Sequence, residues 1–275
     1  AFPHAIEPQY PGALETIVDI TACWDDDKLF ANRDAIVSLS RSCSRCHEYC
    51  CRYLGAAASL AGDTYRIALE CLNSQKLAGY CKRLIERELK PVREGGGRER
   101  IRVFSAVTNE GVVAFTDSIK QLGQRLYLIN DEYGAVSRVV LQTLRTAALA
   151  AGYDILCGYC PLSPFEKLEY LFIPETGAGF VTSNHFHDFS LLLDPYRIVN
   201  YKRFTDMEQL REKRKRLNFN KKAAAQMIAQ AQGLIQDAKI LHDDLEAYYV
   251  QATDFEKVET LTQSVLRRID ALCAR

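Results

Sequence analysis

The stretch LYLINDEYGAVSRVVLQTLRTAALAAG, residues 126–152, decides the fold class of this chain. Its first four residues are apolar and, with Asn130, make a run of strand length, and residues 138–151 repeat their apolar side chains with a helical period. A polar loop that contains one glycine, Gly134, joins the two. Ligands gather at such a turn in α/β sheets, because the free N–H groups at the start of the helix face outward. We therefore expect an α/β sheet with a binding site at 131–138.

Short apolar runs and helical stretches alternate on both sides of this turn. The predicted strands are 101–107, 126–130, 154–159 and 177–181. The predicted helices between them are 114–123 and 138–151. Strands that alternate with helices indicate βαβ units and a mostly parallel sheet.

A linker precedes this α/β part. The segment KPVREGGGRER, residues 90–100, combines a proline, three consecutive glycines and alternating charge, which is typical of an exposed connection. It predicts a helical part at 1–94, an α/β domain at 95–200 and a second helical part at 201–275.

Each predicted helical part contains a long helix with one apolar seam. From Met227 to Ala252 the apolar side chains recur in steps of four and three residues, the heptad spacing of a helix packed along a partner. The same seam runs from Leu39 to Cys71. A second helix follows each one, at 75–90 and 255–273, so we expect two long antiparallel helical hairpins that offer a surface to a protein partner.

The chain also repeats itself. Residues 17–36, IVDITACWDDDKLFANRDAI, align without a gap on residues 198–217, IVNYKRFTDMEQLREKRKRL, with five identities where chance gives about one. A unit of roughly 180 residues is therefore duplicated. Its register predicts that the first copy begins before Ala1, and that any intact phosphate loop of that copy lies there.

At this point the sequence resembles a known family. The resemblance rests on the order and spacing of 3–20, 24–29, FSAVTNEGVVAFTDSI (104–119), 126–149, YCPLSPFEKLEYLFIPETGAGFVTSN (159–184) and AKILHDDLEAYYVQATDFEKV (238–258). These segments are similar to uncharacterised bacterial proteins, mostly from Gram-positive organisms, that carry two tandem P-loop ATPase-like halves. The resemblance implies a P-loop NTPase-like sheet, ATP with magnesium as the cofactor, and a G-x-x-x-x-G-K-[ST] loop at 131–138.

The chain departs from that loop where the chemistry would be. Asp131 and Val136 replace its two glycines, while Ser137 and Arg138 replace the lysine and the magnesium ligand. A phosphate loop needs glycines to wrap its N–H groups around the phosphates and a lysine to neutralise them, whereas Asp131 repels an anion. Thr182 likewise replaces the carboxylate that would support magnesium.

These departures favour a non-catalytic or regulatory nucleotide-binding-like module. Its remaining anion contacts would be Gly134, Ser137 and Arg138, with no catalytic residue and no metal ligand. Two alternatives stay open. One is a functional ATP-binding protein or ATPase that binds ATP and magnesium through Arg138; the other is a purely helical interaction module.

Four further motifs have a functional and an ordinary interpretation. CSRCH at 43–47 matches a haem-attachment or zinc pattern, but its cysteines fall on the apolar seam, where cysteine packs as a small hydrophobe. A redox pair at Cys157 and Cys160 would need to open a helix, and an extended loop follows instead. A metal pair at His185 and His187 would need a third ligand. His242 and Glu246 are best interpreted as helix-surface hydrogen bonding.

The composition excludes some classes of function. Thirty-five basic and 35 acidic residues give a net charge of zero, so no long-range field favours nucleic acid or an anionic membrane. The basic run at 211–222 is expected to be a solvated helix face. The sequence contains no apolar run of membrane-spanning length and no export signal, and its ten cysteines then predict reduced thiols in a cytoplasmic protein.

Overall fold

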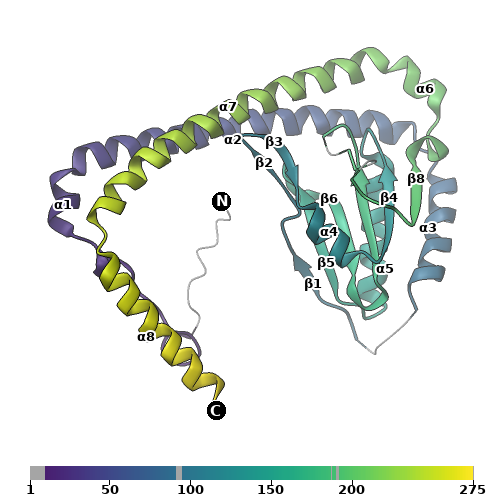
Figure 1. Ribbon diagram of the computed structural model, residues 1–275. Coiled ribbons are helices and arrows are strands. Elements are labelled where there is room, and N and C mark those ends of the chain that lie inside the picture. Colours follow the sequence, from purple (N-terminus) through teal and green to yellow (C-terminus); the bar gives the residue numbers. More distant parts are fainter. Residues whose placement is uncertain (1–9, 91–94, 187, 190–191, 275) are drawn as a thin grey trace. The chain divides into compact units, whose positions relative to one another are not determined.

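The computed structural model describes residues 10–90, 95–186, 188–189 and 192–274. It is an α/β structure with a six-stranded, mostly parallel sheet and two long helices (Figure 1). The strands are β1 (Glu99–Ile101), β2 (Ser105–Thr108), β3 (Gly111–Ala114), β4 (Arg125–Asn130), β5 (Ile155–Cys160), β6 (Ser163–Ile173), β7 (Ala178–Ser183) and β8 (Arg197–Asn200). The α-helices are α1 (Asp26–Ala31), α2 (Arg33–Glu70), α3 (Ser74–Glu88), α4 (Thr116–Leu122), α5 (Ala135–Ala150), α6 (Met207–Glu212), α7 (Arg214–Ala252) and α8 (Phe255–Cys273). Short 3-10 helices are η1 (Thr21–Cys23), η2 (Pro174–Thr176) and η3 (Tyr201–Phe204).

The chain divides into two compact units. One contains residues 46–236 and the other contains the remainder, so the boundary falls inside both α2 and α7. The whole sheet belongs to the first unit. In the described part of the chain, every helix is too short or too polar to cross a membrane.

The large sheet has the order β1-β5-β6-β7-β4-β8, and β2 and β3 form a separate hairpin. Three of its pairings are parallel (β1 with β5, β4 with β7, β4 with β8), while β6 is antiparallel to both neighbours. β4 therefore lies between two parallel strands. Its side chains Leu128 and Ile129 are fully buried on opposite faces of the sheet, which explains its continuous apolar sequence.

Most of the predicted α/β elements are present within a few residues of their expected ends, and two predictions need correction. The expected strand 101–107 is two strands, because the chain leaves the sheet after Ile101 and Phe104 is buried in the core cluster on the other face from α5. Strand β6 was not predicted. A proline and three charged residues (Pro164, Glu166, Lys167 and Glu169) are untypical of a strand, but the chain continues directly from β5 into β6 through a tight turn.

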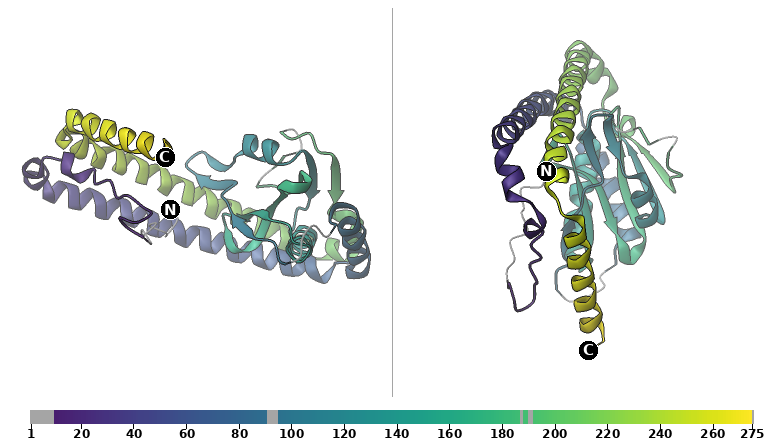
Figure 2. Two further views of the ribbon diagram at one scale, coloured as in Figure 1. Left: turned by 90° about the horizontal axis from the view of Figure 1, so that it is seen from below. Right: turned by 60° about the vertical axis from the view of Figure 1, so that its left-hand side comes forward.

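The seam prediction is confirmed, and its partner is now known. Cys43, Ala57, Ala231 and Ala238 are all buried along the seams of α2 and α7. These two helices pack against each other in opposite directions (Figure 2). In the unit of residues 46–236, Asn220 of α7 donates to Asp63 of α2 at 2.7 Å.

Helix α3 packs on the sheet instead of folding back along α2 as the hairpin prediction expected. Leu77 and Leu84 are fully buried against α5 and the sheet. At the end of α3, the Glu88 carboxylate accepts hydrogen bonds from Tyr127 Oη at 2.5 Å and Arg125 Nη2 at 2.9 Å. These contacts fix α3 across the face of the sheet that α5 also covers.

The duplication is visible in the structure itself. Helices α6, α7 and α8 begin 181 residues after α1, α2 and α3, the same offset as the sequence repeat. Equivalent side chains cap equivalent helices: Asp25 accepts from the amide of Lys28, and Asp206 accepts from the amide of Gln209. The repeated unit is thus a structural unit and not only a similarity of letters.

Candidate functional site

The turn between β4 and α5 is closed by a carboxylate from the protein. Asp131 is only 2% exposed. Its Oδ1 accepts hydrogen bonds from the amides of Tyr133 at 3.2 Å and Gly134 at 3.0 Å, and its Oδ2 accepts from the amide of Ser137 at 2.7 Å. These are the free N–H groups at the positive end of α5, the groups that hold phosphate in a phosphate loop. An internal anion already occupies them.

Gly134 allows this turn to form. Its φ of +79° lies in the left-handed region that favours glycine, and it is the residue that immediately precedes α5. A β-carbon at this position would lie 3.4 Å from Cε of Lys167 on β6. The position therefore needs glycine for its backbone conformation, and any side chain there would press on Lys167.

Lys167 brings a buried positive charge beside the turn. Its Nζ lies 2.6 Å from Oε1 of Glu169, and both side chains are buried or nearly so. Burial acts to lower the pKa of Lys167, but the negative charge of Glu169 outweighs it, and the pKa is raised. Lys167 is thus a cation beside the turn, although Glu169 already neutralises it.

The three residues predicted as anion contacts lie together at the start of α5 but point to different surroundings. Ser137 is fully buried beneath the turn, and its hydroxyl, like that of Thr182, has no hydrogen-bond partner among the described residues. Gly134 and Arg138 line a cavity on the outer side of the turn. The Arg138 guanidinium lies 4.1 Å from the ring centre of Tyr65 on α2.

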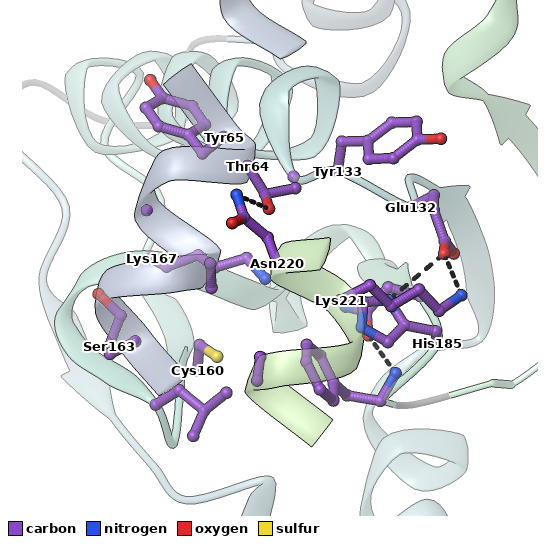
Figure 3. A pocket seen from close by; sticks show the side chains of 18 of the residues that line it. Thr64, Tyr65, Glu132, Tyr133, Cys160, Ser163, Lys167, His185, Asn220 and Lys221 are labelled. Atoms are coloured by element: carbon purple, nitrogen blue, oxygen red, sulfur yellow. Dashed lines mark hydrogen bonds and ion pairs between the residues drawn. The ribbon is translucent and has the colours of Figure 1, made fainter. Parts of the chain in front are cut away.

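That cavity has a volume of about 390 Å³, a size typical of small-molecule sites (Figure 3). Its walls come from α2, the turn after β4, the β5–β6 turn, residues 184–186 and the start of α7. The small residues Ala58, Ala61 and Gly62 of α2 line one wall, and three aromatic residues also line the cavity. These aromatic residues are Tyr65, Tyr133 and Phe186.

The arginines of the cavity favour an anion, because its two lysines are each paired with a glutamate. Four cationic side chains line it (Arg66, Arg138, Lys167 and Lys221), against two carboxylates (Glu132 and Glu166). Glu132 accepts from Lys221 at 2.6 Å and lies 3.5 Å from His185 Nδ1 (Figure 3). Nε of Arg138 is buried and has no partner in the part of the chain that the structure describes. An arginine held against a ring with an unused donor is suited to a phosphate or carboxylate group.

The cysteine motifs are packing residues. Cys43 and Cys50 are buried on the α2 seam. Cys157 and Cys160 lie inside β5 instead of at a helix start, and burial raises the pKa of Cys160 to about 11. A thiol with a raised pKa is a poor nucleophile and a poor redox centre.

The structure describes the histidine motifs only in part. His185 contacts Glu132 at the cavity, while His187 and His4 lie outside the described residues. His242, Asp243 and Glu246 form the one cluster of possible metal ligands found among the described residues, and all three are exposed. Asp243 is already paired with Lys239 at 2.6 Å, which agrees with helix-surface bonding.

Several residues of the site could not be found from local sequence. Lys167 lies on β6, which was not predicted. Tyr65 and Lys221 lie on the two long helices, which are far from the turn in the sequence. The only available signal was the charged pair Lys167 and Glu169 in the FEKLEYLF segment, and this pair also fits a strand with one solvent-exposed face. No family model matches this chain, and neither a curated protein nor a solved structure matches it.

Proposed function

We propose that this chain is a non-catalytic binding module, related to P-loop ATPases, that takes a small phosphate-bearing molecule of the nucleotide class in the cavity beside α5. The observation that carries the proposal is the Asp131 carboxylate, which fills the N–H groups that phosphoryl-transfer enzymes use for the β-phosphate. A triphosphate gripped in the usual way would have to displace a buried carboxylate from three amide donors. Binding and hydrolysis at that turn are therefore disfavoured.

The neighbouring cavity supplies what such a ligand needs. Arg138 offers an unused donor for a phosphate, and Tyr65 and Tyr133 offer aromatic faces for a planar group. Magnesium binding would need a carboxylate near the turn, and position 182 holds a threonine instead. The module would thus sense a ligand without transforming it.

The test is calorimetric titration of AMP and ADP into the full chain, together with a magnesium–ATP turnover assay. We expect binding that Arg138→Ala weakens about 10-fold or more, as expected for the loss of one charge-assisted hydrogen bond. Arg83→Ala, which removes an exposed arginine of α3 outside the cavity, is the matched control and should bind like the wild type. The rate of ATP hydrolysis should equal the rate in buffer without protein.

Two results would overturn the proposal. Magnesium-dependent ATP hydrolysis lost in Arg138→Ala would establish the alternative of a working ATPase. Absence of any heat of binding with AMP, ADP or inorganic phosphate would remove the ligand-binding role and leave the helical interaction module.

A further inference from the structure

The two copies of the repeat build two equivalent elbows, one in each compact unit. In the unit of residues 46–236, Leu72 at the α2–α3 joint forms an antiparallel bridge with Thr205 after η3. In the other unit, Thr253 at the α7–α8 joint forms the same bridge with Trp24 after η1. Each bridging position in one elbow lies 181 residues from its counterpart in the other. Each elbow therefore joins chain from both copies, in the same way.

The two elbows are packed equally well at their centres. Cys71 is 4% exposed and its counterpart Ala252 is 3% exposed. Phe204 is 1% exposed and its counterpart Cys23 is 3% exposed. The two elbows are thus alike at their centres. They differ in what is attached to them.

The elbow of residues 46–236 carries the sheet domain. Helix α3 leaves this elbow and covers the sheet through Leu77 and Leu84, which are 0% and 1% exposed. Just before the elbow, β8 pairs in parallel with β4, and its Val199 is 6% exposed. One helix and one edge strand together hold the domain of residues 99–200.

The other elbow presents the same two elements without a sheet. Helix α8 has no buried side chain, although Val258 and Val265 occupy the positions of Leu77 and Leu84. Farther along α8, Ile269 and Leu272 are 48% and 66% exposed. The apolar stripe has helical spacing, and among the described residues Val258 and Val265 are only half-buried, so α8 is an amphipathic helix whose apolar face is largely exposed.

The segment before η1 is also exposed, as far as the structure describes the chain. Ile17 and Val18 stand at the positions of Ile198 and Val199 of β8, yet Val18 is 41% exposed where Val199 is 6%. Even the local turn is repeated, since Asp19 accepts from the amide of Thr21 as Asn200 accepts from the amide of Lys202. Residues 17–19 lie in no strand of this structure, although their counterparts in β8 pair with the edge of the sheet.

We infer that α8 and residues 17–20 form a docking surface for an α/β domain of the same architecture as residues 99–200, contributed from outside residues 1–275. Residues 17–19 would pair in parallel with its edge strand, and the α8 stripe would cover its helix-bearing face. The contacts of β8 and α3 in the other unit define the geometry.

A second copy of this chain does not fit the role. Each copy has one sheet domain, and its own α3 and β8 already occupy that domain, with the advantage of being in the same chain. Each copy has two docking positions, so copies alone always leave half of them empty. The occupant must bring a further sheet domain with a vacant face and a vacant edge.

The chemistry of α8 also narrows the partner. Ile269 replaces Glu88, the carboxylate that accepts hydrogen bonds from Arg125 and Tyr127. A partner sheet that placed an arginine there would bury its charge without a counterion, which is costly. The partner should therefore be apolar at the positions of Arg125 and Tyr127.

The experiment supplies a sheet domain and measures amide hydrogen exchange over 255–273. The probe is an extended chain in which a copy of residues 95–196 is joined directly to Thr16, so that residues 16–20 take the place of β8. Exchange in α8 should be at least 10-fold slower than in the unmodified chain, and Val258→Asp with Val265→Asp should restore fast exchange. A second extended chain with Ile269→Glu provides the carboxylate that the added Arg125 and Tyr127 require.

Unchanged exchange of α8 in both extended chains would overturn the inference, whether or not the added sheet folds, because the surface would then fail to hold it. A dimer of the unmodified chain in sedimentation, lost on Val258→Asp, would also overturn it in favour of a second copy. In the unmodified chain, Val258→Asp with Val265→Asp should lower the thermal midpoint far less than Leu77→Asp with Leu84→Asp, because Val258 and Val265 are half-buried whereas Leu77 and Leu84 are fully buried.

Discussion

Replacing Asp131 with alanine removes the internal anion from the start of α5. Three buried amide donors, those of Tyr133, Gly134 and Ser137, lose a charged acceptor at 3.2, 3.0 and 2.7 Å. A hydrogen bond to a charged group contributes about 1.5–3 kcal/mol, and loss of a helix cap costs about 0.5–2 kcal/mol. Because water can enter the vacated space and satisfy some donors, we expect a net loss of about 2–4 kcal/mol.

The assay is urea unfolding followed by far-UV circular dichroism, with Asp206→Ala as the matched control. Asp206 caps α6 through the amides of Glu208 and Gln209, but it is exposed, so its removal should cost about 1 kcal/mol. Inorganic phosphate should then stabilise Asp131→Ala more than it stabilises the wild type, with a further gain of about 2.7 kcal/mol at 100 times its dissociation constant for the vacated amides. If Asp131→Ala stays within about 0.5 kcal/mol of the wild type, or gains no more from phosphate than the wild type does, the reasoning is refuted.

Three further predictions concern packing outside the cavity. Burial acts to raise the pKa of Glu88, but its hydrogen bonds outweigh burial and lower the pKa below its ordinary value of 4.5. Its stabilising contribution is therefore present above pH 4.5 and lost as pH falls through the lowered pKa. Urea titrations should show that Glu88→Gln is about 1–3 kcal/mol less stable than the wild type at neutral pH. Its free energy of unfolding should also fall less than that of the wild type as the pH is lowered, and an equal fall in both proteins would contradict this. Leu84→Ala should cost about 2–5 kcal/mol and its repeat counterpart Val265→Ala less than about 1 kcal/mol in the same assay, and equal costs would refute the uncovered face of α8. Iodoacetamide should label exposed Cys51 in the native protein and spare Cys157, whose pKa is raised by burial; mass spectrometry that finds both labelled would refute the packing role.

The features predictable from the sequence are those encoded in local periodicity. The strand and helix around Gly134 follow from an apolar run and a helical period, and the seams of α2 and α7 follow from heptad spacing. The repeat of 181 residues predicted the matching helix starts. Each of these signals depends only on neighbours in the chain.

The remaining features depend on contacts between distant segments. The sequence places Asp131 at the start of the turn, but it does not show that its carboxylate turns inward onto three amides. Lys167 reaches the turn because β6 runs antiparallel to its neighbours, a pairing that no local pattern specifies. Likewise, α3 packs on the sheet and not along α2. The apolar face of α3 suits either partner, so its sequence does not decide between them.

The most direct test of the central claim is a crystal structure of the wild-type chain grown with ADP. The account predicts that Asp131 keeps its hydrogen bonds to the amides of Gly134 and Ser137, and that the phosphates lie against Arg138 in the cavity. Phosphate oxygens bound to the amides of 133–137, with the Asp131 side chain turned out, would contradict it.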